Sequence, residues 1–484
     1  MERELEILCE IAKNISELNG TVYLVGGYVR DLILKKENKD IDVEVYGIEL
    51  HKLKEVLCQF GKVDEVGSSF GILMIHGLSI DFAVPRREIL AKKLEASKRI
   101  VIPFDYEDKH TNLIQSVCPD FIIEPKPDEK FTHKDFIIVS DPFMTLEEAS
   151  KRRDFTINAL MKNVLTGEII DFWGGLDDIK KKIIRHIDEK TFIEDALRVL
   201  RACQFASRFE FTIAPETIEI CKSIDLTTLP KERIFEELWK ALMKGAKPSI
   251  AFEMMRKIGV IEKLFPELYA LIGCPQNSYY HPEGNVWNHT MLVIDYASKL
   301  KDKSRNPEIF MFASLLHDVG KPKTTEFRGN RIISPNHDII GVNVAKSFLY
   351  RITNEKSLID GVCAIVRNHM RLLGLYPNAS NKAIRRLSVD IDINEILLFA
   401  EADSMGKGSD AESFSKISKW IDAKLIEIGA NEEIRPCITG KDLIALGMKP
   451  NKEFRVILEE AFDMQLEGKS KKEILEIVLR KHST

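Results

Sequence analysis

Residues 23–47, YLVGGYVRDLILKKENKDIDVEVYG, decide the fold of the N-terminal part of this chain of 484 residues. The stretch begins as an apolar, β-branched strand, and the paired glycines Gly26 and Gly27 then permit a tight turn. We expect a helix to start near Tyr28, with backbone amides at the turn positioned to bind a phosphate. The pattern therefore predicts a phosphate-binding turn between a buried strand and a helix.

Two carboxylates follow the predicted helix. Residues 40–45 read DIDVEV, and because side chains alternate along a strand, Asp40 and Asp42 project from the same face. Two adjacent like charges are unfavourable unless a cation neutralises them, and ligands that are all oxygen favour Mg²⁺ shared with substrate phosphates. An isolated Asp-x-Asp pair more often lies on a solvated strand, but here the glycine turn upstream favours a metal site.

A third carboxylate is expected close to this pair. Residues 70–76 (FGILMIH) and 78–84 (LSIDFAV) indicate two strands joined by Gly77, which would place Asp81 on a neighbouring strand. Two metal ions about 4 Å apart suit in-line attack of a hydroxyl on an α-phosphate. One ion would lower the pKa of the attacking 3′-hydroxyl and the other would stabilise the leaving pyrophosphate. We therefore predict that Asp40, Asp42 and Asp81 are catalytic.

Basic residues reappear at residues 151–159, KRRDFTINA. Arg152 and Arg153 can clamp a phosphate, while Asp154 and Asn158 lie one helical turn apart and can bond the two hydroxyls of a ribose. A run of this kind is also typical of a surface ion-pair cluster, which contributes little to stability.

The segment EDALRVLR, residues 194–201, opens an amphipathic helix on which Asp195, Arg198 and Arg201 recur every third residue. A carboxylate accepts and a guanidinium donates hydrogen bonds, so Asp195 with Arg198 can mimic the Watson–Crick edge of a template base. Such a pair would accept cytosine and adenine and reject uracil and guanine. The alternative is a simple salt bridge on a solvated helix.

Six segments in collinear order resemble a bacterial class II tRNA nucleotidyltransferase, the family of CCA-adding enzymes. They are VGGYVRD, KDIDVEV, RRDFTINAL, DFWGGLDDI, EDALRVLRACQFASRF and KERIFEELWKAL. The resemblance implies a polymerase-beta-like head with Asp40 and Asp42 as Mg²⁺ ligands, and CTP and ATP as substrates. It further implies nucleotide-binding roles in three sets. Gly26, Gly27 and Arg30 would bind the phosphates; Arg152, Arg153, Asp154 and Asn158 would surround the sugar and triphosphate; Asp195, Arg198 and Arg201 would read the base.

A second set of metal-ligand residues lies downstream, on segments that read as apolar helices. A single histidine on such a face is more often a packed core residue than a ligand, but six ligand-type residues at buried helix positions indicate a site. The spacing resembles an HD-domain metal-dependent phosphohydrolase over residues 275–408. The expected ligands of one metal are His289, His317, Asp318 and Asp403, and His337 and His369 would bind a second metal or the substrate phosphate. Mixed imidazole and carboxylate ligands select no single divalent metal.

Length and an ordinary hydrophobic content of 44% indicate three or four domains with real cores in an α+β chain. We expect a nucleotidyltransferase head with a small mixed sheet over residues 1–175, with an insertion at about 97–132. All-α parts are expected to follow: a base-reading neck over 176–270, the HD domain over 271–408 and a helical tail over 409–484.

Net charge and cysteine usage indicate how the protein could bind nucleic acid and in which compartment it is expected. The formal charge of −5 argues against indiscriminate nucleic-acid binding, so a tRNA partner requires a local basic surface. Residues 180–185, 240–257 and 299–305 are candidates. Eight scattered cysteines without a Cys-x-x-Cys pattern favour reduced thiols, and no signal peptide or membrane span is expected, so we predict a cytoplasmic protein.

The residues thus predict an enzyme that adds C and A, one nucleotide at a time, to the 3′ end of tRNA without a nucleic-acid template. Two alternatives stay open. The head could add only A or only CC, or it could merely bind RNA while the HD domain, a phosphodiesterase or phosphatase, is the working enzyme.

Overall fold

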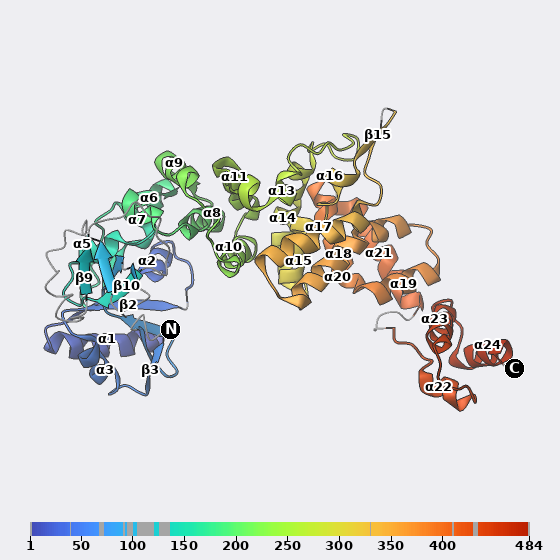
Figure 1. The fold of residues 1–484 in the computed structure, drawn as a ribbon, viewed down its shortest axis with the longest axis horizontal. Helices are drawn as coiled ribbons and strands as arrows, with labels where there is room; N and C mark the ends of the chain where they lie inside the picture. Colours follow the sequence, from blue (N-terminus) through green and yellow to red (C-terminus); the bar gives the residue numbers. More distant parts are fainter. Residues whose placement is uncertain are drawn as a thin grey trace. The chain divides into compact units, whose positions relative to one another are not determined.

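The protein forms two compact units, Met1–Leu229 and Pro230–Thr484, in a computed structural model. The structure describes residues 2–38, 40–66, 72–90, 92–93, 100–103, 121–124, 136–329, 331–408, 411–428 and 434–482. Each unit is described by itself, and Figure 1 shows the elements of both.

The first unit contains a seven-stranded mixed sheet of order β12-β11-β1-β2-β5-β4-β3. β2 and β5 are parallel, and the other neighbours in this sheet are antiparallel. The strands are β1 (Thr21–Val25), β2 (Ile41–Tyr46), β3 (Val63–Val66), β4 (Ile72–Ile75), β5 (Ile80–Ala83), β11 (Met161–Asn163) and β12 (Ile169–Ile170). The expected small mixed sheet of the head is confirmed.

Three N-terminal helices accompany this sheet: α1 (Glu2–Glu17), α2 (Gly26–Ile33) and α3 (Leu50–Leu57). In α1 the buried residues Leu8, Ile11, Ala12 and Ile15 follow the helical period, so one apolar stripe packs against β1 and α3. The helix α2 begins at Gly26, two residues earlier than expected, because Gly26 itself takes φ +67° and makes the turn at the end of β1.

The expected insertion at about 97–132 lies mostly outside the described residues. Its described parts are β8 (Ile100–Pro103) and β9 (Phe121–Glu124), which pair in parallel, while β7 (Lys92–Lys93) pairs with β8. The flanking strands β6 (Arg86–Leu90) and β10 (Phe136–Ser140) form a separate antiparallel pair. The stretches FIIE and FIIVS therefore form strands.

Short helices complete the first unit and carry its second set of site residues. Phe155 is fully buried and packs edge to face against Phe192 and Phe205, which fixes the RRDF segment against the later helices. The elements are α5 (Leu146–Lys151), η2 (Thr156–Asn158), α6 (Gly175–Lys181), β13 (Ile183–Ile184), α7 (Glu189–Ile193), α8 (Leu197–Phe209), β14 (Thr212–Ile213) and α9 (Pro215–Ser223).

The second unit is helical apart from one hairpin. Its first part contains α10 (Lys231–Lys244), α11 (Pro248–Ile258), α12 (Val260–Leu264), α13 (Pro266–Tyr269), α14 (Val286–Leu300), η3 (Lys301–Lys303), α15 (Pro307–Leu316) and α16 (Lys321–Thr324). The hairpin β15 (Glu326–Arg328) and β16 (Arg331–Ile333) precedes α17 (His337–Ile352), α18 (Lys356–Leu375), α19 (Asn381–Asp390) and α20 (Ile393–Gly406).

The helix α15 is the centre of this unit. Every residue of α15 from Phe310 to Leu316 is buried, and the helix contacts α10, α14, α18 and α20. A helix that is apolar on all sides must be surrounded by other elements, so its C-terminal end at His317 is held inside the bundle. The chain then resumes in α16 (Lys321–Thr324), with Pro322 in its first turn, where a proline is tolerated.

The last helices form a small core of their own. They are α22 (Gly440–Ala445), α23 (Glu453–Leu466) and α24 (Lys471–His482), whereas the preceding α21 (Ala411–Ile428) contacts α19 and α20. Buried Ile438, Leu443, Ile457 and Ile474 belong to one hydrophobic cluster. The α+β fold with a helical C-terminal half is confirmed. No helix of the described residues is long and apolar enough to cross a membrane.

Candidate active sites

The three predicted carboxylates of the head lie together. The parallel register of β2 and β5 places Asp42 opposite Asp81, and Asp40 lies two residues before Asp42, on the same side of the chain. Partial withdrawal from water and the neighbouring carboxylates raise the pKa of Asp42, against the effect of Arg153. The same withdrawal, then Asp40, raises the pKa of Asp81. The site thus carries excess negative charge with oxygen donors only, which fits Mg²⁺.

The glycine turn and the RRD segment meet at this site. A Cβ added to Gly26 would lie 3.0 Å from Nη1 of Arg153 and 3.5 Å from Oδ2 of Asp42. Nη2 of Arg153 donates to Glu44 at 2.9 Å, and Nη2 of Arg152 lies 3.7 Å from the same oxygen of Glu44. Nε of Arg153 is buried without a hydrogen-bond partner among the described residues. The two arginines therefore lie beside the carboxylates, as a triphosphate site requires.

Arg30 lies deeper than its predicted role on the phosphates suggested. Its side chain is 3% exposed, and it donates to Asp31 at 2.8 Å and to Asn158 at 2.5 Å. The guanidinium also lies 4.6 Å from the ring centre of Phe209. The nearest part of Arg30 would lie 3.4 Å from a Cβ at Gly27. Arg30 already has protein partners. The contact of Gly27 and Arg30 with a phosphate therefore stays a prediction.

Asp154 and Asn158 come together, but as partners of each other. Nδ2 of Asn158 donates to Asp154 at 2.8 Å, and Arg201 donates to the same carboxylate through Nε at 2.8 Å. Burial would raise the pKa of Asp154, but Arg201 and Asn158 outweigh burial and hold it below its ordinary value. Asn158 sits in a 3-10 turn rather than an α-helix, and its Oδ1 faces Arg30.

Asp195 and Arg198 flank the start of α8. Asp195 precedes the helix and accepts from the backbone of Leu197 at 3.0 Å. Arg198 donates to the carbonyls of Thr191 at 2.6 Å and Arg152 at 2.8 Å. Arg198 is thereby oriented by main-chain acceptors, and its bond to the carbonyl of Arg152 links α8 to the arginine pair.

Sequence reasoning missed two buried acids of the head. Glu44 continues the alternation of Asp40 and Asp42, which was the signal for it, and it orients Arg153. Asp31 is fully buried and joins Arg30 to Arg208, whose Nη2 lies 3.3 Å away. Nothing in the local sequence indicated that second ion pair, because Asp31 and Arg208 are 177 residues apart.

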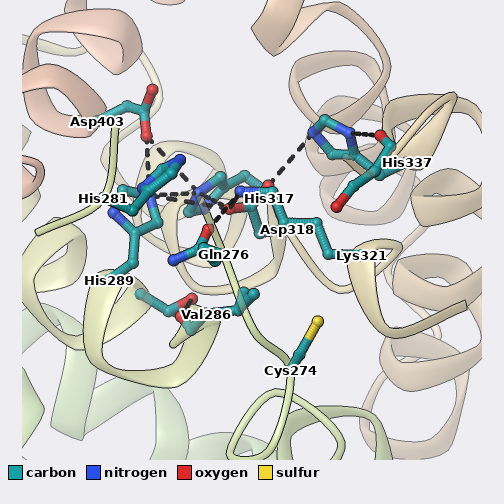
Figure 2. A network of polar contacts seen from close by, with 12 residues as sticks. Cys274, Gln276, His281, Val286, His289, His317, Asp318, Lys321, His337 and Asp403 are labelled. Carbon is teal, nitrogen blue, oxygen red and sulfur yellow. Dashed lines mark hydrogen bonds and ion pairs between the residues drawn. The ribbon is translucent and has the colours of Figure 1, made fainter. Parts of the chain in front are cut away.

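The second unit brings all six predicted ligand residues into one cluster, which is 0–7% exposed. It consists of His289 on α14, His317 and Asp318 after α15, His337 on α17, His369 on α18 and Asp403 on α20. Figure 2 shows most of them, with His337 approaching Asp318 from the side opposite His289. We name this set the histidine cluster.

Asp318 stands between two pairs of imidazoles. Its Oδ2 lies 3.1 Å from Nε2 of His317 and 3.8 Å from Nε2 of His289, and Asp403 Oδ1 lies 2.9 Å from the latter. Its Oδ1 lies 3.4 Å from Nε2 of His337 and 3.7 Å from Nε2 of His369. The two oxygens of one carboxylate thus face two separate groups of donors.

Backbone carbonyls around the histidine cluster fix the tautomers of three of its histidines. Nδ1 of His317, His337 and His369 lies 2.7–3.0 Å from the carbonyls of Ser314, Ser334 and Val366. A carbonyl only accepts, so each Nδ1 carries the proton and each Nε2 presents a lone pair inward.

The inward nitrogens lie too close together for neutral rings on their own. Nε2 of His289 lies 3.2 Å from Nε2 of His317, and the same distance separates His337 and His369. In His337 and His369 two lone pairs face each other and repel, whereas a divalent cation between them would be bound; Nε2 of His289 also lies 2.9 Å from Oδ1 of Asp403. The donor set therefore fits metal ions, and burial, which lowers the pKa of His369 to about 3, keeps that ligand neutral.

Two lysines and a glycine complete the surroundings of Asp318 and Asp403. Lys321 lies 2.6 Å from Asp318 and Lys407 lies 2.5 Å from Asp403. Burial opposes the charge of both carboxylates, but His317 and Lys321 hold the pKa of Asp318, and Lys407 that of Asp403, well below the usual range.

At Gly320 an added Cβ would lie 2.0 Å from the carbonyl of His337, so this contact requires glycine.

Sequence reasoning also missed a carboxylate behind the cluster. Oε1 of Glu283 lies 2.9 Å from Nδ1 of His289 and 2.9 Å from Nδ1 of His281. These three residues can themselves gather around a cation. Burial opposes its charge, yet the hydrogen bond with His281 and the proximity of His289 lower the pKa of Glu283 to about 2. The signal was the segment HPEGNVWNH, residues 281–289, where acid and histidine recur within one loop and the first helical turn.

A cavity of about 810 Å³ opens onto the histidine cluster. Its lining includes Gln276, Tyr279, Tyr280, His281, His317, Asp318, Lys321, Arg331, His337, His369, Asp403 and Lys407. The buried metal-ligand groups are therefore accessible to a ligand through this opening.

Family models match three successive parts of the chain. They describe a "Poly A polymerase head domain" over residues 22–185, a "Probable RNA and SrmB- binding site of polymerase A" over 210–271 and an "HD domain" over 286–405. Fold and sites therefore define a nucleotidyltransferase head followed by an HD domain.

Curated relatives narrow this class. The "Multifunctional CCA protein" of Actinobacillus pleuropneumoniae serotype 5b (strain L20) is 30% identical over 418 residues, which cover 82% of this chain and 89% of the relative. The chain belongs to this family of CCA-adding tRNA nucleotidyltransferases, which confirms the predicted resemblance.

Solved structures share the fold. The Bacillus stearothermophilus CCA-adding enzyme in complex with CTP matches with a TM-score of 0.64 at 19% identity, over 100% of this chain and 98% of that one. The Thermotoga maritima CCA-adding enzyme complexed with tRNA_CCA matches with a TM-score of 0.57 at 22% identity, over 98% and 95%.

Proposed function

We propose that the head of this chain adds CMP and AMP from CTP and ATP to the 3′ end of tRNA. The observation that carries this proposal is the register of Asp42 with Asp81, beside the glycine turn and Arg153. Three carboxylates with raised charge density next to a phosphate-binding turn serve nucleotidyl transfer and have no use in a pure RNA binder. The titles of the two solved relatives, which name CTP and tRNA, support the same substrates.

Asp40 and Asp42 are the proposed Mg²⁺ ligands, and Asp81 stands beside them. Bound there, Mg²⁺ would activate the terminal 3′-hydroxyl and neutralise the leaving pyrophosphate. The chain's own part is to hold the triphosphate with the amides of the glycine turn and with Arg152 and Arg153. Asp154 and Asn158 are proposed to bind the ribose.

Asp195 and Arg198 are the proposed readers of the incoming base, with Arg201 beside them. Their donor and acceptor pattern matches cytosine and adenine, and a good pair of this kind discriminates by about 1–3 kcal/mol. Addition of C twice and A once then requires the site to change as the tRNA end grows.

The decisive experiment uses three tRNA transcripts that end at the discriminator base, at C and at CC, each with one nucleotide at a time. Full CCA addition predicts CTP use on the first two transcripts and ATP use on the third. Extension of only the CC transcript would identify an A-adding enzyme, and failure on that transcript alone would identify a CC-adding enzyme. No extension of any transcript would contradict transfer by the head.

A second proposed activity rests on the histidine cluster. The inward Nε2 lone pairs and the accessible cavity favour a metal-dependent phosphohydrolase. His289, His317, Asp318 and Asp403 would hold one metal, and His337 and His369 a second metal or the substrate phosphate. A bound divalent metal would polarise the phosphate and supply a water of lowered pKa.

We propose 2′,3′-cyclic phosphates or 2′-phosphates at damaged RNA ends as substrates of the HD domain. Phosphate release or ring opening should appear with at least one of Mn²⁺, Ni²⁺, Co²⁺, Fe²⁺ and Mg²⁺. If none of these metals supports hydrolysis, the second activity is refuted while the first stands.

The division into a head over 1–175, a neck over 176–270, an HD domain over 271–408 and a tail over 409–484 is retained as a proposal. So is the cytoplasmic location, for which the seven described cysteines, all free thiols, are the support.

A further inference from the structure

Two tyrosines lie exposed at the cavity of the histidine cluster. Tyr279 is 84% and Tyr280 65% exposed, and both line the cavity. Their rings pack edge to face, with centroids 4.9 Å apart and planes at 89°. Large aromatic surface left open to water contributes nothing to the core, so its position at this opening points to a ligand with a flat apolar part.

The backbone holds these rings close to the metal-ligand groups. Asn277 accepts from the amide of Tyr279 through Oδ1 at 3.0 Å and from the amide of Tyr280 through its carbonyl at 3.1 Å. The next residue, His281, has its ring centroid 5.0 Å from that of His289. One tight turn therefore connects the aromatic pair with the histidine cluster.

The same cavity offers positive charge for a phosphate. Lys321 and Lys407 lie beside the cluster, and Arg331 lines the cavity from β16. The volume of about 810 Å³ lies within the range of small-molecule sites, about 300–1,000 Å³, and far exceeds what a lone phosphate needs. The cavity thus combines a phosphate-binding floor with an aromatic side.

We propose that Tyr279 and Tyr280 form a base-stacking platform, so that the HD site selects phosphate esters that carry a nucleobase. Stacking is tolerant of base identity because every base has a π-face. The site would therefore detect that a base is present without distinguishing which one. This inference rests on the proposed hydrolase activity and adds its specificity-determining residues.

The test compares substrates with and without a base. Adenosine and uridine 2′,3′-cyclic phosphates are set against 1-O-methylribose 2,3-cyclic phosphate, which lacks only the base. The double variant Tyr279→Ala/Tyr280→Ala should raise KM for both nucleotides about ten-fold with little change in kcat, and leave the base-free ester unaffected. The double variant with Phe at both positions should retain the wild-type KM.

Tyr350→Ala serves as the matched control, because Tyr350 is half-exposed on α17 and does not line the cavity. An oligoribonucleotide ending in a 2′,3′-cyclic phosphate forms a separate arm. A lower KM for the oligonucleotide than for the free nucleotide, lost in the Ala double variant, would identify an RNA end as the source. Equal KM values would identify the free nucleotide.

The proposal is overturned if the Ala double variant raises KM for the base-free ester as much as for the nucleotides, or if it raises KM for none of them. Absence of hydrolysis by the wild type would contradict the proposed hydrolase activity. The base-stacking role of the two tyrosines is then tested by calorimetric titration with adenosine 2′-phosphate. Equal affinity of wild type and Ala double variant would overturn it, and about ten-fold weaker binding by the variant would support it.

Discussion

The carboxylates of the head and the histidine cluster of the second unit both gather metal-binding groups, but under different burial. Asp40 and Asp42 are exposed, and Asp81 is partly so. The histidine cluster is 0–7% exposed, and four of its rings are oriented from behind by carbonyls or by Glu283. An open site leaves room for a triphosphate and an RNA end, whereas a buried one binds its ion with ligands that are already in place.

The two sites also differ in how the charge of their carboxylates is balanced. The pKa values of Asp42 and Asp81 are raised, because partial withdrawal from water and the neighbouring carboxylates act together. Those of Asp318 and Asp403 are lowered, because Lys321 and Lys407 with the histidines outweigh burial. The head thus depends on substrate and metal to balance its charge, while the second site is balanced by its own lysines. Five experiments test this contrast.

The largest effect is expected for Asp42→Ala. Asp42 is a proposed ligand of the Mg²⁺ that would neutralise the transferring phosphate, so its removal should cost several kcal/mol and tRNA extension should fall about a thousand-fold. Single-turnover extension with CTP measures it. Asp64→Ala, at an exposed carboxylate on β3 of the same sheet, is the control and should extend normally. Extension by Asp42→Ala at the wild-type rate would refute the two-metal assignment.

His317→Ala should separate the two sites. Loss of one imidazole from the buried cluster leaves Asp318 without its nearest histidine, so hydrolysis should fall at least about a hundred-fold. Extension of tRNA should be unaffected. Phosphate release and extension assayed on the same preparation provide both readings, and a parallel fall in both would mean that the contrast between independent sites is wrong.

Glu283→Gln tests whether the cluster is oriented from behind. Glu283 contacts Nδ1 of His289, and loss of such an outer partner typically lowers metal affinity about 10–100-fold. Calorimetric titration with Mn²⁺ measures this change. The exposed Glu326→Gln on β15 is the matched control. Unchanged affinity in Glu283→Gln would show that the carbonyl-held histidines suffice.

Asp195→Ala and Arg198→Ala should change the choice of nucleotide more than the rate. Each removes one half of the base-reading pattern, so the preference for CTP and ATP over UTP and GTP should fall about ten-fold. Competition among the four nucleotides measures it. A preserved preference would leave base selection to other groups.

The smallest expected effect is a loss of stability at acidic pH. The pKa of Asp154 is lowered in the fold, chiefly by Arg201 and against burial. Its stabilising contribution is therefore complete above the ordinary pKa of aspartate, about 3.9, and is lost as pH falls through the lower folded value. The protection of residues 146–160 against hydrogen exchange, relative to the intrinsic rate at each pH, should fall on acidification in the wild type and much less in Asp154→Asn. Identical pH dependence in the two proteins would contradict this role.

Much of the candidate head site could be predicted, because its ligands are encoded by short-range periodicity. The alternation in DIDVEV fixes the shared face of Asp40 and Asp42, and the strand pattern around Gly77 predicted the neighbour that carries Asp81. Arg30 shows the limit of that reasoning. Its place beside the glycine turn suggested phosphate contact, but its burial is decided by Asn158 and Phe209, which are remote in sequence.

The HD ligands were also visible as histidines and aspartates on apolar helices, but their partners were not. The sequence did not single out Lys407 or Glu283, although each contacts a proposed ligand. The fold alone places α14 and α20 side by side, which brings residues 289 and 403 together.

The sequence by itself determined the class of protein, the order of its parts and the candidate metal-binding groups, because residue type and local period specify these. Tertiary structure decided which groups face one another: Asp42 opposite Asp81, Arg30 withdrawn to Asn158, and Asp318 between two pairs of histidines. Contacts across more than a few turns depend on packing of the whole core, and burial and long-range partners set the charge of each group. The phosphate turn and carboxylate pair of residues 23–47 therefore became a nucleotidyl-transfer site only with the help of residues far along the chain.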